Sequence, residues 1–233
     1  MADLLDGLVA ALRLLITGDR QLWTIIWLSL WVSGAALLIS AVCGVPLGAW
    51  LGLHSFPGRR LVTTLIYTGM GLPPVVVGLF VTVLLWRSGP LGAFGLLYTP
   101  AAMVVAQALI ATPIVSALTA AALQQVDPDF LLQMRALGAT RPRALRALLA
   151  EARLPLLAAG LAGFGAVVSE VGAAQMVGGN IAGQTRVLTT AAVLATSRGQ
   201  FALAIAFGLV LLAVAFAVNL LGTLAQQRTA RPS

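Results

Sequence analysis

The chain has 233 residues, of which 60% are hydrophobic and only 9% are charged, and its mean hydropathy is +0.99. A soluble domain of this size needs roughly a quarter of its residues to be charged, so the composition excludes a soluble globular protein. The formal net charge of +7 comes from arginine alone, in short loops between apolar blocks, which argues against a nucleic-acid-binding protein.

Residues 1–21 precede the first apolar block. Asp3, Asp6 and Asp19 interrupt this segment, and no basic start precedes an apolar run, so the segment lacks the pattern of a cleavable signal peptide. The stretch Leu4–Ile16 is amphipathic, and we expect it to lie at the membrane surface or to lead into the first span.

Five apolar blocks follow within a transmembrane domain, residues 22–225, and each reaches the roughly 20 residues that cross a ~30 Å hydrocarbon core. The first block is too long for one upright crossing, so it is expected to tilt or to extend beyond the bilayer. Gly44, Pro46 and Gly48 near its end are residues that can bend a helix. The predicted fold class is therefore all-α, a polytopic transmembrane bundle of about five spans. The blocks lie within Leu22–Leu53, Leu61–Trp86, Pro100–Leu123, Pro155–Met176 and Phe201–Leu224.

Glycines in the first block predict close helix packing. Gly44, Gly48 and Gly52 recur every four residues and so lie on one face, where another backbone can approach. The fourth block is also rich in glycine and alanine. Both patterns indicate a bundle interior rather than separate membrane anchors.

The arginines predict the orientation of the chain. If the loop at 54–60, the loop at 124–154 and the tail at 226–233 share one side, that side carries nine arginines against five on the other. Positively charged loops stay in the cytoplasm, which places the N-terminus outside and the C-terminus in the cytoplasm. The nine are Arg59, Arg60, Arg135, Arg141, Arg143, Arg146, Arg153, Arg228 and Arg231, and the five are Arg13, Arg20, Arg87, Arg186 and Arg198.

The loop at about 124–154 has the pattern of two helices joined at a glycine. Asp127 and Pro128 are typical of a helix start, Gly138 of a helix end, and Thr140 can cap a second helix. Merely joining two spans takes two to eight residues, so we expect this loop to have a further role. It is either an amphipathic hairpin on anionic lipid or a docking elbow for a cytoplasmic partner.

Four blocks of the sequence resemble a known family. Met134-Arg135-Ala136-Leu137-Gly138-Ala139, followed by Leu154-Pro155, resembles the coupling loop of ABC importer permeases, the EAA loop. Phe164–Ala173 and Met176–Leu194 resemble stretches of molybdate- and tungstate-type permeases, the second closest to the tungstate branch, and Gly71–Gly78 is similar to their Leu-Pro-Pro…Gly stretch. Together the resemblance covers roughly residues 22–225.

One departure from the family pattern concerns the coupling loop. Leu132-Gln133-Met134 stands where the Glu-Ala-Ala that names the loop would fall, so the acidic contact is missing. The glycine and the apolar ridge remain, and docking through shape is still expected. The coupling residues that the resemblance implies are Arg135, Ala136, Leu137, Gly138 and Ala139.

The resemblance implies the permease subunit of an ABC type I importer for a tetrahedral oxyanion, with tungstate, or else molybdate, as the expected substrate. It further implies a homodimer of permeases in a bacterial or archaeal cytoplasmic membrane, two cytoplasmic ATP-binding subunits and an extracytoplasmic oxyanion-binding protein. The sequence has no GxxxxGK[ST] loop, catalytic triad or metal-ligand cluster. We therefore expect no enzyme activity, metal or cofactor in this chain, with ATP used by the partner.

Two other classes remain open from the residues themselves. A secondary transporter or channel for an anion would work without an ATPase partner, and a membrane scaffold or assembly factor would move no substrate. Recovery of an ATPase partner with the chain separates both classes from an importer.

Two prolines and one acid are candidates for the transport pathway. Pro73 and Pro74 interrupt the second span, and we favour a bend that lines the path over a purely structural kink. Glu170 is an acid inside the predicted fourth span. Because a carboxylate repels a divalent anion, we expect Glu170 to hold the loop at Gly178-Gly179-Asn180, or an arginine, with a gate latch as the alternative.

The segment that follows supplies the remaining candidates. Arg186 can attract the anion, although a surface position is equally compatible with the sequence. Gly178 and Gly179 permit close backbone approach, so with Asn180 they form either a gate or a plain turn.

Overall fold

The computed structural model describes residues 2–230 and, within them, the side chains of residues 5–9, 12–13 and 16–227. This part of the chain is helical, without a strand, so the all-α prediction is confirmed. The helices are α1 (Ala2–Ile16), α2 (Arg20–Leu53), α3 (Arg59–Met70), α4 (Pro74–Leu85), the 3-10 turn η1 (Gly92–Phe94), α5 (Pro100–Gln124), α6 (Phe130–Ala136), α7 (Arg141–Glu151), α8 (Arg153–Val168), α9 (Gly172–Gly178), α10 (Leu188–Ser197) and α11 (Phe201–Ala230).

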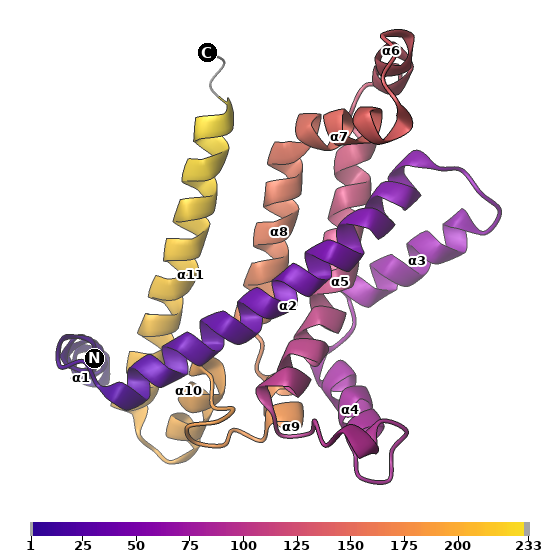
Figure 1. Cartoon of the computed structure of the whole chain (residues 1–233). Helices are drawn as coiled ribbons and strands as arrows, with labels where there is room; N and C mark the ends of the chain where they lie inside the picture. The colour runs from indigo at the N-terminus through magenta and orange to yellow at the C-terminus, as the bar shows by residue number, and fades with distance from the viewer. Residues whose placement is uncertain (1, 231–233) are drawn as a thin grey trace.

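Long helices and bent helix pairs run between the two ends of the bundle (Figure 1). Three are single helices long and apolar enough to cross a membrane, namely α2, α5 and α11 up to Gln227. Two more are bent helix pairs, α3 with α4 and α7 with α8, so up to five spans are present in residues 2–230. The elbow formed by α6 and α7, the turn after α2 and the C-terminal end of α11 share one end, and α1 lies at the other.

Helix α2 is the longest helix of the described residues and packs against both α5 and α8. Its 34 residues span about 51 Å at 1.5 Å per residue, and Figure 1 shows it running diagonally across α5 and α8. The side chain of Asp19 starts the helix by accepting a hydrogen bond from Leu22 N at 2.7 Å. The helix continues unbroken through Pro46 to Leu53, and its length is that of a span that is tilted or that extends beyond the bilayer.

The predicted glycine face of α2 packs against α5. A Cβ added to Gly44 would lie 3.1 Å from Thr112 O, and one added to Gly48 would lie 2.4 Å from Ser116 O. Gly52 approaches Ala120 O in the same way, at 3.1 Å. A Cβ at Gly48 would collide with the backbone of α5, those at Gly44 and Gly52 would be tight, and the prediction of close packing is confirmed.

The second apolar block is two helices rather than one. α3 and α4 meet at 99° across Gly71, Leu72 and Pro73. Pro73 disfavours helical backbone at the residue before it, which ends α3, and Pro74 at the first helical position begins α4. The predicted interruption of the second block at Pro73 and Pro74 is confirmed, and its angle of 99° makes the break a sharp one.

The fourth block is also broken. α8 ends at Val168, and the short helix α9 begins at Gly172. The Ser169 hydroxyl donates to Gly165 O at 2.8 Å, closing the last turn of α8. Glu170 therefore lies in the joint between two helices rather than inside a continuous span. The helix α10, which follows, was not expected from the hydropathy.

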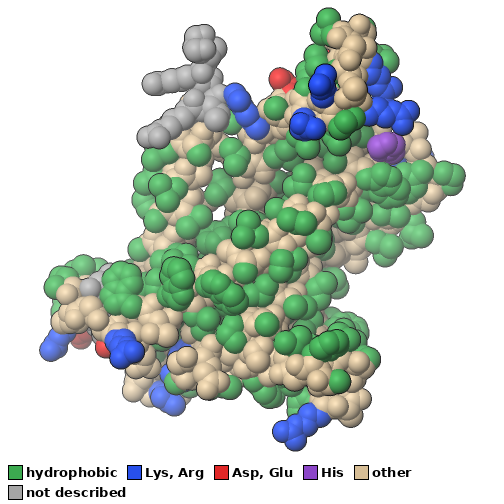
Figure 2. All heavy atoms as spheres, in the orientation of Figure 1, with side chains coloured by type: hydrophobic (Ala, Val, Ile, Leu, Met, Phe, Trp, Pro, Cys, Tyr) green, Lys and Arg blue, Asp and Glu red, His purple; other side chains and the backbone are tan. Residues whose placement is uncertain are grey.

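Apolar side chains form the interior where α2, α4, α5 and α9 meet, with Val32, Val81, Met103 and Val177 at its centre. On the face that Figure 2 shows, hydrophobic side chains cover the middle of the molecule, and arginines gather near its two ends. This distribution is the one expected of a bundle that crosses a bilayer.

Candidate functional site

The elbow at one end is built around Gly138. This glycine has φ +79°, in the left-handed region. Gly138 N donates to Arg135 O at 2.9 Å, and Ala139 N donates to Met134 O at 3.0 Å. These two bonds are those of a Schellman motif, which closes the end of α6 and fixes the direction of the chain into α7. The predicted helix end at Gly138 is confirmed.

The start of each elbow helix differs from the expectation in detail. Asp127 Oδ1 accepts from Asp129 N at 2.8 Å, so this side chain forms a local turn and α6 begins only at Phe130. Thr140 occupies the position before α7, but its side chain makes no capping hydrogen bond. Pro142, in the first turn of α7, has no N–H to be capped, which leaves less for Thr140 to satisfy.

The elbow is anchored on one side and exposed on the other. Leu148 of α7 is only 2% exposed and packs with Ala49, Leu123 and Ala152, at the ends of α2, α5 and α7. In contrast, Leu132 is 60% and Leu137 is 79% exposed. The elbow is thus held in place by Leu148, while Leu132 and Leu137 form an exposed apolar tip that can fill a hydrophobic groove on another protein. Of the other predicted coupling residues, Arg135 and Ala136 are exposed and Ala139 is half-buried.

The opposite end carries a compact loop, residues 178–187, held by Thr185. This side chain is fully buried, and its Oγ1 donates to Gly178 O at 2.5 Å and accepts from Ile181 N at 2.9 Å. Sequence reasoning missed Thr185, because a threonine between polar residues gives no signal that its hydroxyl turns inward.

Asn180 and Arg186 fasten the same loop. Arg186 Nε donates to Asn180 Oδ1 at 3.1 Å, and Arg186 Nη2 donates to Asn180 O at 3.2 Å. Asn180 Nδ2 in turn donates to Thr190 O on α10 at 3.3 Å. Gly179 (φ +70°) and Asn180 (φ +52°) both adopt left-handed backbone, which glycine and asparagine tolerate best. The structure thus brings Gly178, Gly179, Asn180 and Arg186 together in one turn.

The hairpin formed by residues 86–99 packs against the 178–187 loop. Tyr98 N donates to Val177 O at 2.8 Å. A Cβ added to Gly179 would lie 2.8 Å from the ring of Tyr98, so glycine is required by this contact as well as by its backbone angle. The Tyr98 contact, which was not predicted, connects the 86–99 hairpin to the end of α9.

Glu170 acts on α9 and α10 rather than on the 178–180 turn. Its carboxylate Oε1 accepts from Ala173 N at 2.8 Å in the first turn of α9. Its backbone carbonyl accepts from the Thr189 hydroxyl, also at 2.8 Å. The residue is 7% exposed. The expectation that its carboxylate holds Gly178-Gly179-Asn180 or an arginine is corrected, since the amide N–H groups of a helix start are nearer and favour a carboxylate.

The bend at Pro73 and Pro74 lies beside this region. A Cβ added to Gly172 would lie 2.6 Å from Val75 Cγ2 and 3.5 Å from Glu170 Oε1, and one added to Gly78 would lie 2.7 Å from Ala173 Cα. The first turns of α4 therefore press directly on α9. The predicted pathway residues share the end of the bundle that α4, α9 and α10 form, while the elbow residues lie at the other end (Figure 1).

The family model described as a binding-protein-dependent transport system inner membrane component matches residues 44–231, most of the chain. The chain belongs to this family. It is a multi-pass inner-membrane permease, and both the elbow and the broken helices described above lie within the matched residues.

Named relatives narrow the comparison. The permease is 40% identical to the tungstate uptake system permease protein TupB of Peptoclostridium acidaminophilum, over 94% of this chain and 96% of that protein. It is 42% identical to a probable anion ABC transporter permease protein of Haloferax volcanii, over 86% and 89% of the two chains. Identity to the molybdenum transport system permease protein ModB of Escherichia coli is 32%, over 72% and 77%.

Solved structures share the fold. A chain of the MetNI methionine ABC transporter in an inward-facing conformation superposes with a TM-score of 0.75, at 20% identity, over 91% of this permease and 98% of that chain. An ABC transporter that imports the acidic polysaccharide alginate gives a TM-score of 0.74, at 19% identity, over 91% and 81%. The architecture is therefore that of ABC type I importer permeases.

Proposed function

We propose that this permease moves a tetrahedral oxyanion, tungstate or molybdate, into the cytoplasm as part of an ATP-driven importer. The observation that carries the substrate is the 40% identity to a tungstate uptake permease across nearly the whole of both chains. Weaker similarity to molybdenum permeases extends the class to the related dianion. Tungstate is favoured over molybdate because the match to the tungstate uptake permease covers more of both chains and has the higher sequence identity.

In this proposal the elbow receives the driving force. A separate cytoplasmic ATPase subunit binds the exposed apolar tip at Leu132 and Leu137. Because the Schellman motif and the buried Leu148 join the tip firmly to α7, a displacement of the tip is passed to α8 and to the ends of α2 and α5. ATP binding then favours one of two arrangements of the bundle through this contact. Leu132-Gln133-Met134 carries no acid where the Glu-Ala-Ala pattern would place one, so docking depends on shape and apolar contact.

The other partners follow from the same function. Two copies of the permease form the pathway, two ATPase subunits bind the two elbows, and an extracytoplasmic binding protein delivers the anion to the end that carries the 178–187 loop. This arrangement places the elbow in the cytoplasm and the N-terminus outside. The broken segments at Pro73 and Glu170 lie where helices can shift, and we assign them to the path and its gate.

A secondary transporter or channel is not favoured. Such a protein has no use for an exposed apolar elbow of two helices, whereas relatives named as uptake-system and ABC permeases match 94% and 86% of the chain. Uptake that survives depletion of ATP, together with purification without any ATPase subunit, would support this alternative and overturn the importer.

The test of the proposed function is uptake of tungstate and molybdate by cells that express the complete transporter with Leu137→Ser in the permease. Truncating a central apolar contact weakens association by more than about 1 kcal/mol, or roughly fivefold or more, so co-purification of the ATPase subunit and ATP-dependent uptake should both fall. Leu91→Ser is the matched control, because Leu91 is an exposed leucine at the opposite end. Normal uptake and co-purification in Leu137→Ser would refute docking at this tip.

A further inference from the structure

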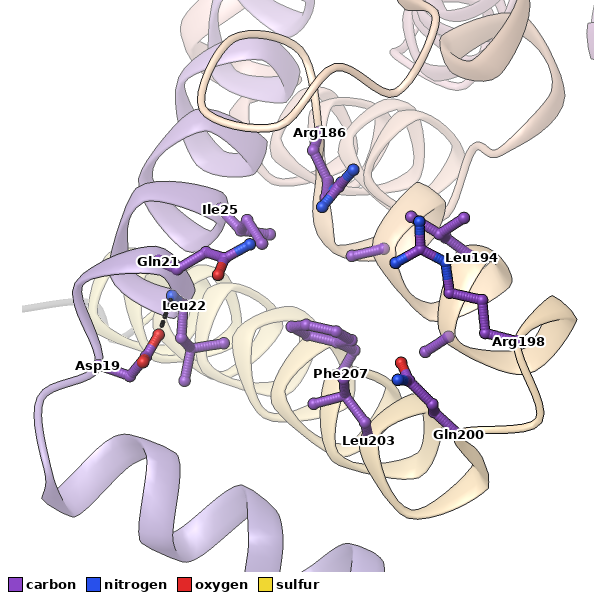
Figure 3. A pocket seen from close by; sticks show the side chains of 12 residues that line it. Asp19, Gln21, Leu22, Ile25, Arg186, Leu194, Arg198, Gln200, Leu203 and Phe207 are labelled. Carbon is purple, nitrogen blue, oxygen red and sulfur yellow. Dashed lines mark hydrogen bonds between the residues drawn. The ribbon is translucent and has the colours of Figure 1, made fainter.

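A cavity of about 190 Å³ opens at the end of the bundle opposite to the elbow. It lies between the start of α2, the end of α10 and the start of α11, and its floor is apolar, formed by Leu22, Ile25 and Phe207. Besides Asp19, polar side chains from three segments of the chain line it (Figure 3). They are Gln21 from α2, Arg186 from the 178–187 loop, and Arg198 and Gln200 from the turn between α10 and α11.

The charge of the cavity is positive. Two guanidinium groups face one carboxylate, that of Asp19, and its Oδ1 is engaged with Leu22 N at 2.7 Å. Arg186 is held in place, because its Nε and Nη2 donate to Asn180. Its Nη1 group is left for a ligand among the described residues. Arg198 follows the last turn of α10 and is exposed, so its guanidinium can adjust to a ligand.

These groups select one chemistry. Arginine presents only donors, in a planar fork that matches two oxygens of a phosphate-like group, so cations are repelled and anions are bound. The side-chain amides of Gln21 and Gln200 add uncharged N–H donors. A cavity of this size accommodates several waters, or one four-oxygen anion with water around it.

We propose that this cavity is a binding site for a tetrahedral oxyanion group, held by Arg186 and Arg198 with Gln21 and Gln200 as neutral donors. The biological reading rests on the proposed function: the cavity receives the anion at the face where the binding protein releases it. The same chemistry is offered by the phosphate of a lipid headgroup, and the two sources are separated by experiment.

The site can be followed with a cysteine reporter in the purified transporter, in nanodiscs of phosphatidylcholine. Cys43→Ser removes the single native cysteine, and Leu194→Cys places a thiol on the cavity wall. The rate at which a neutral methanethiosulfonate reagent modifies this thiol should fall as tungstate, molybdate or inorganic phosphate is added. The concentration giving half of the protection then reports affinity.

Arg198→Gln should raise that concentration at least about tenfold, since it removes a charge-assisted partner. Arg87→Gln is the matched control, because Arg87 is also exposed at this end and lines a different cavity. It should leave the protection unchanged. Equal effects of the two variants would show a diffuse surface potential and overturn the site.

Asp19→Asn supplies a readout that damage to the fold cannot imitate. Asparagine caps a helix as well as aspartate does, so α2 should keep its start. Loss of the single carboxylate should strengthen protection by the anion severalfold. Weaker or unchanged protection in this variant would contradict electrostatic binding in the cavity.

Nanodiscs that contain phosphatidylglycerol distinguish the source of the group. If a headgroup occupies the cavity, this lipid should lower the labelling rate without added anion, and Arg198→Gln should restore the rate. Absence of protection by every anion and by phosphatidylglycerol overturns the proposal. Failure of tungstate and molybdate uptake with protection intact would instead overturn the proposed function and leave the site standing.

Discussion

The conformation of the 178–187 loop depends on the hydroxyl group of Thr185. Thr185→Val keeps the shape of the side chain but leaves Gly178 O and Ile181 N without a partner inside the protein. The free energy of unfolding should fall by about 2–4 kcal/mol, because each buried polar group without a partner costs about 1–3 kcal/mol. Thermal unfolding of the detergent-purified permease measures the change.

Thr185→Ser is the control for that prediction, because it retains both hydrogen bonds and removes only a buried methyl group. Its cost should be about 1 kcal/mol. If valine and serine prove equally destabilising, packing rather than hydrogen bonding holds the loop, and the importance assigned here to the hydroxyl is wrong.

Among the helices, the contact between α2 and α5 sets how closely the bundle packs. Gly48→Ala would place a Cβ 2.4 Å from Ser116 O and 2.6 Å from Thr119 Cβ. Neither the backbone of Ser116 nor the β-branched side chain of Thr119 can move aside at low cost, so the free energy of unfolding should drop by about 1–3 kcal/mol.

Gly34→Ala, on the same helix, is the control, because a Cβ there meets nothing within 4 Å. That variant should be neutral or more stable by up to about 1 kcal/mol, since alanine favours helix. Denaturation in detergent compares the two, and a similar loss in both would show that helix propensity, not close approach, governs this position.

How far the sequence predicts these elements depends on how local their signals are. The glycine face of α2 and the helix end at Gly138 were predicted, because a four-residue repeat and a left-handed helix end depend on nearby residues alone. The break at Pro73 was predicted as well, because two prolines interrupt a helix locally, whereas the break around Glu170 does not change the hydropathy and the fourth apolar block ran through it. Arg198 and Gln21 lie far apart in the sequence and meet only when α2, α10 and α11 pack. Their shared cavity could not have been found without the fold.

At the scale of the whole molecule, the path of the chain fixes which segments share a side. The turn after α2, the elbow and the end of α11 lie together, and the 86–99 hairpin and the 178–187 loop lie at the opposite end (Figure 1). Among the described side chains, arginines are more numerous at the elbow end, with Arg59, Arg60, Arg135, Arg141, Arg143, Arg146 and Arg153. Positively charged loops are retained in the cytoplasm, so the elbow end should be cytoplasmic.

This orientation can be measured on intact cells with a membrane-impermeant maleimide in the Cys43→Ser background. Ser88→Cys and Ala182→Cys, both exposed at the end opposite to the elbow, should react at once. Ser55→Cys, exposed in the turn after α2, should react only after the membrane is permeabilised. The reverse pattern would invert the molecule and place the arginine-lined cavity in the cytoplasm, where it could not receive anion from a binding protein. Reaction of all three positions before permeabilisation would contradict the odd number of crossings on which the assignment of both ends depends.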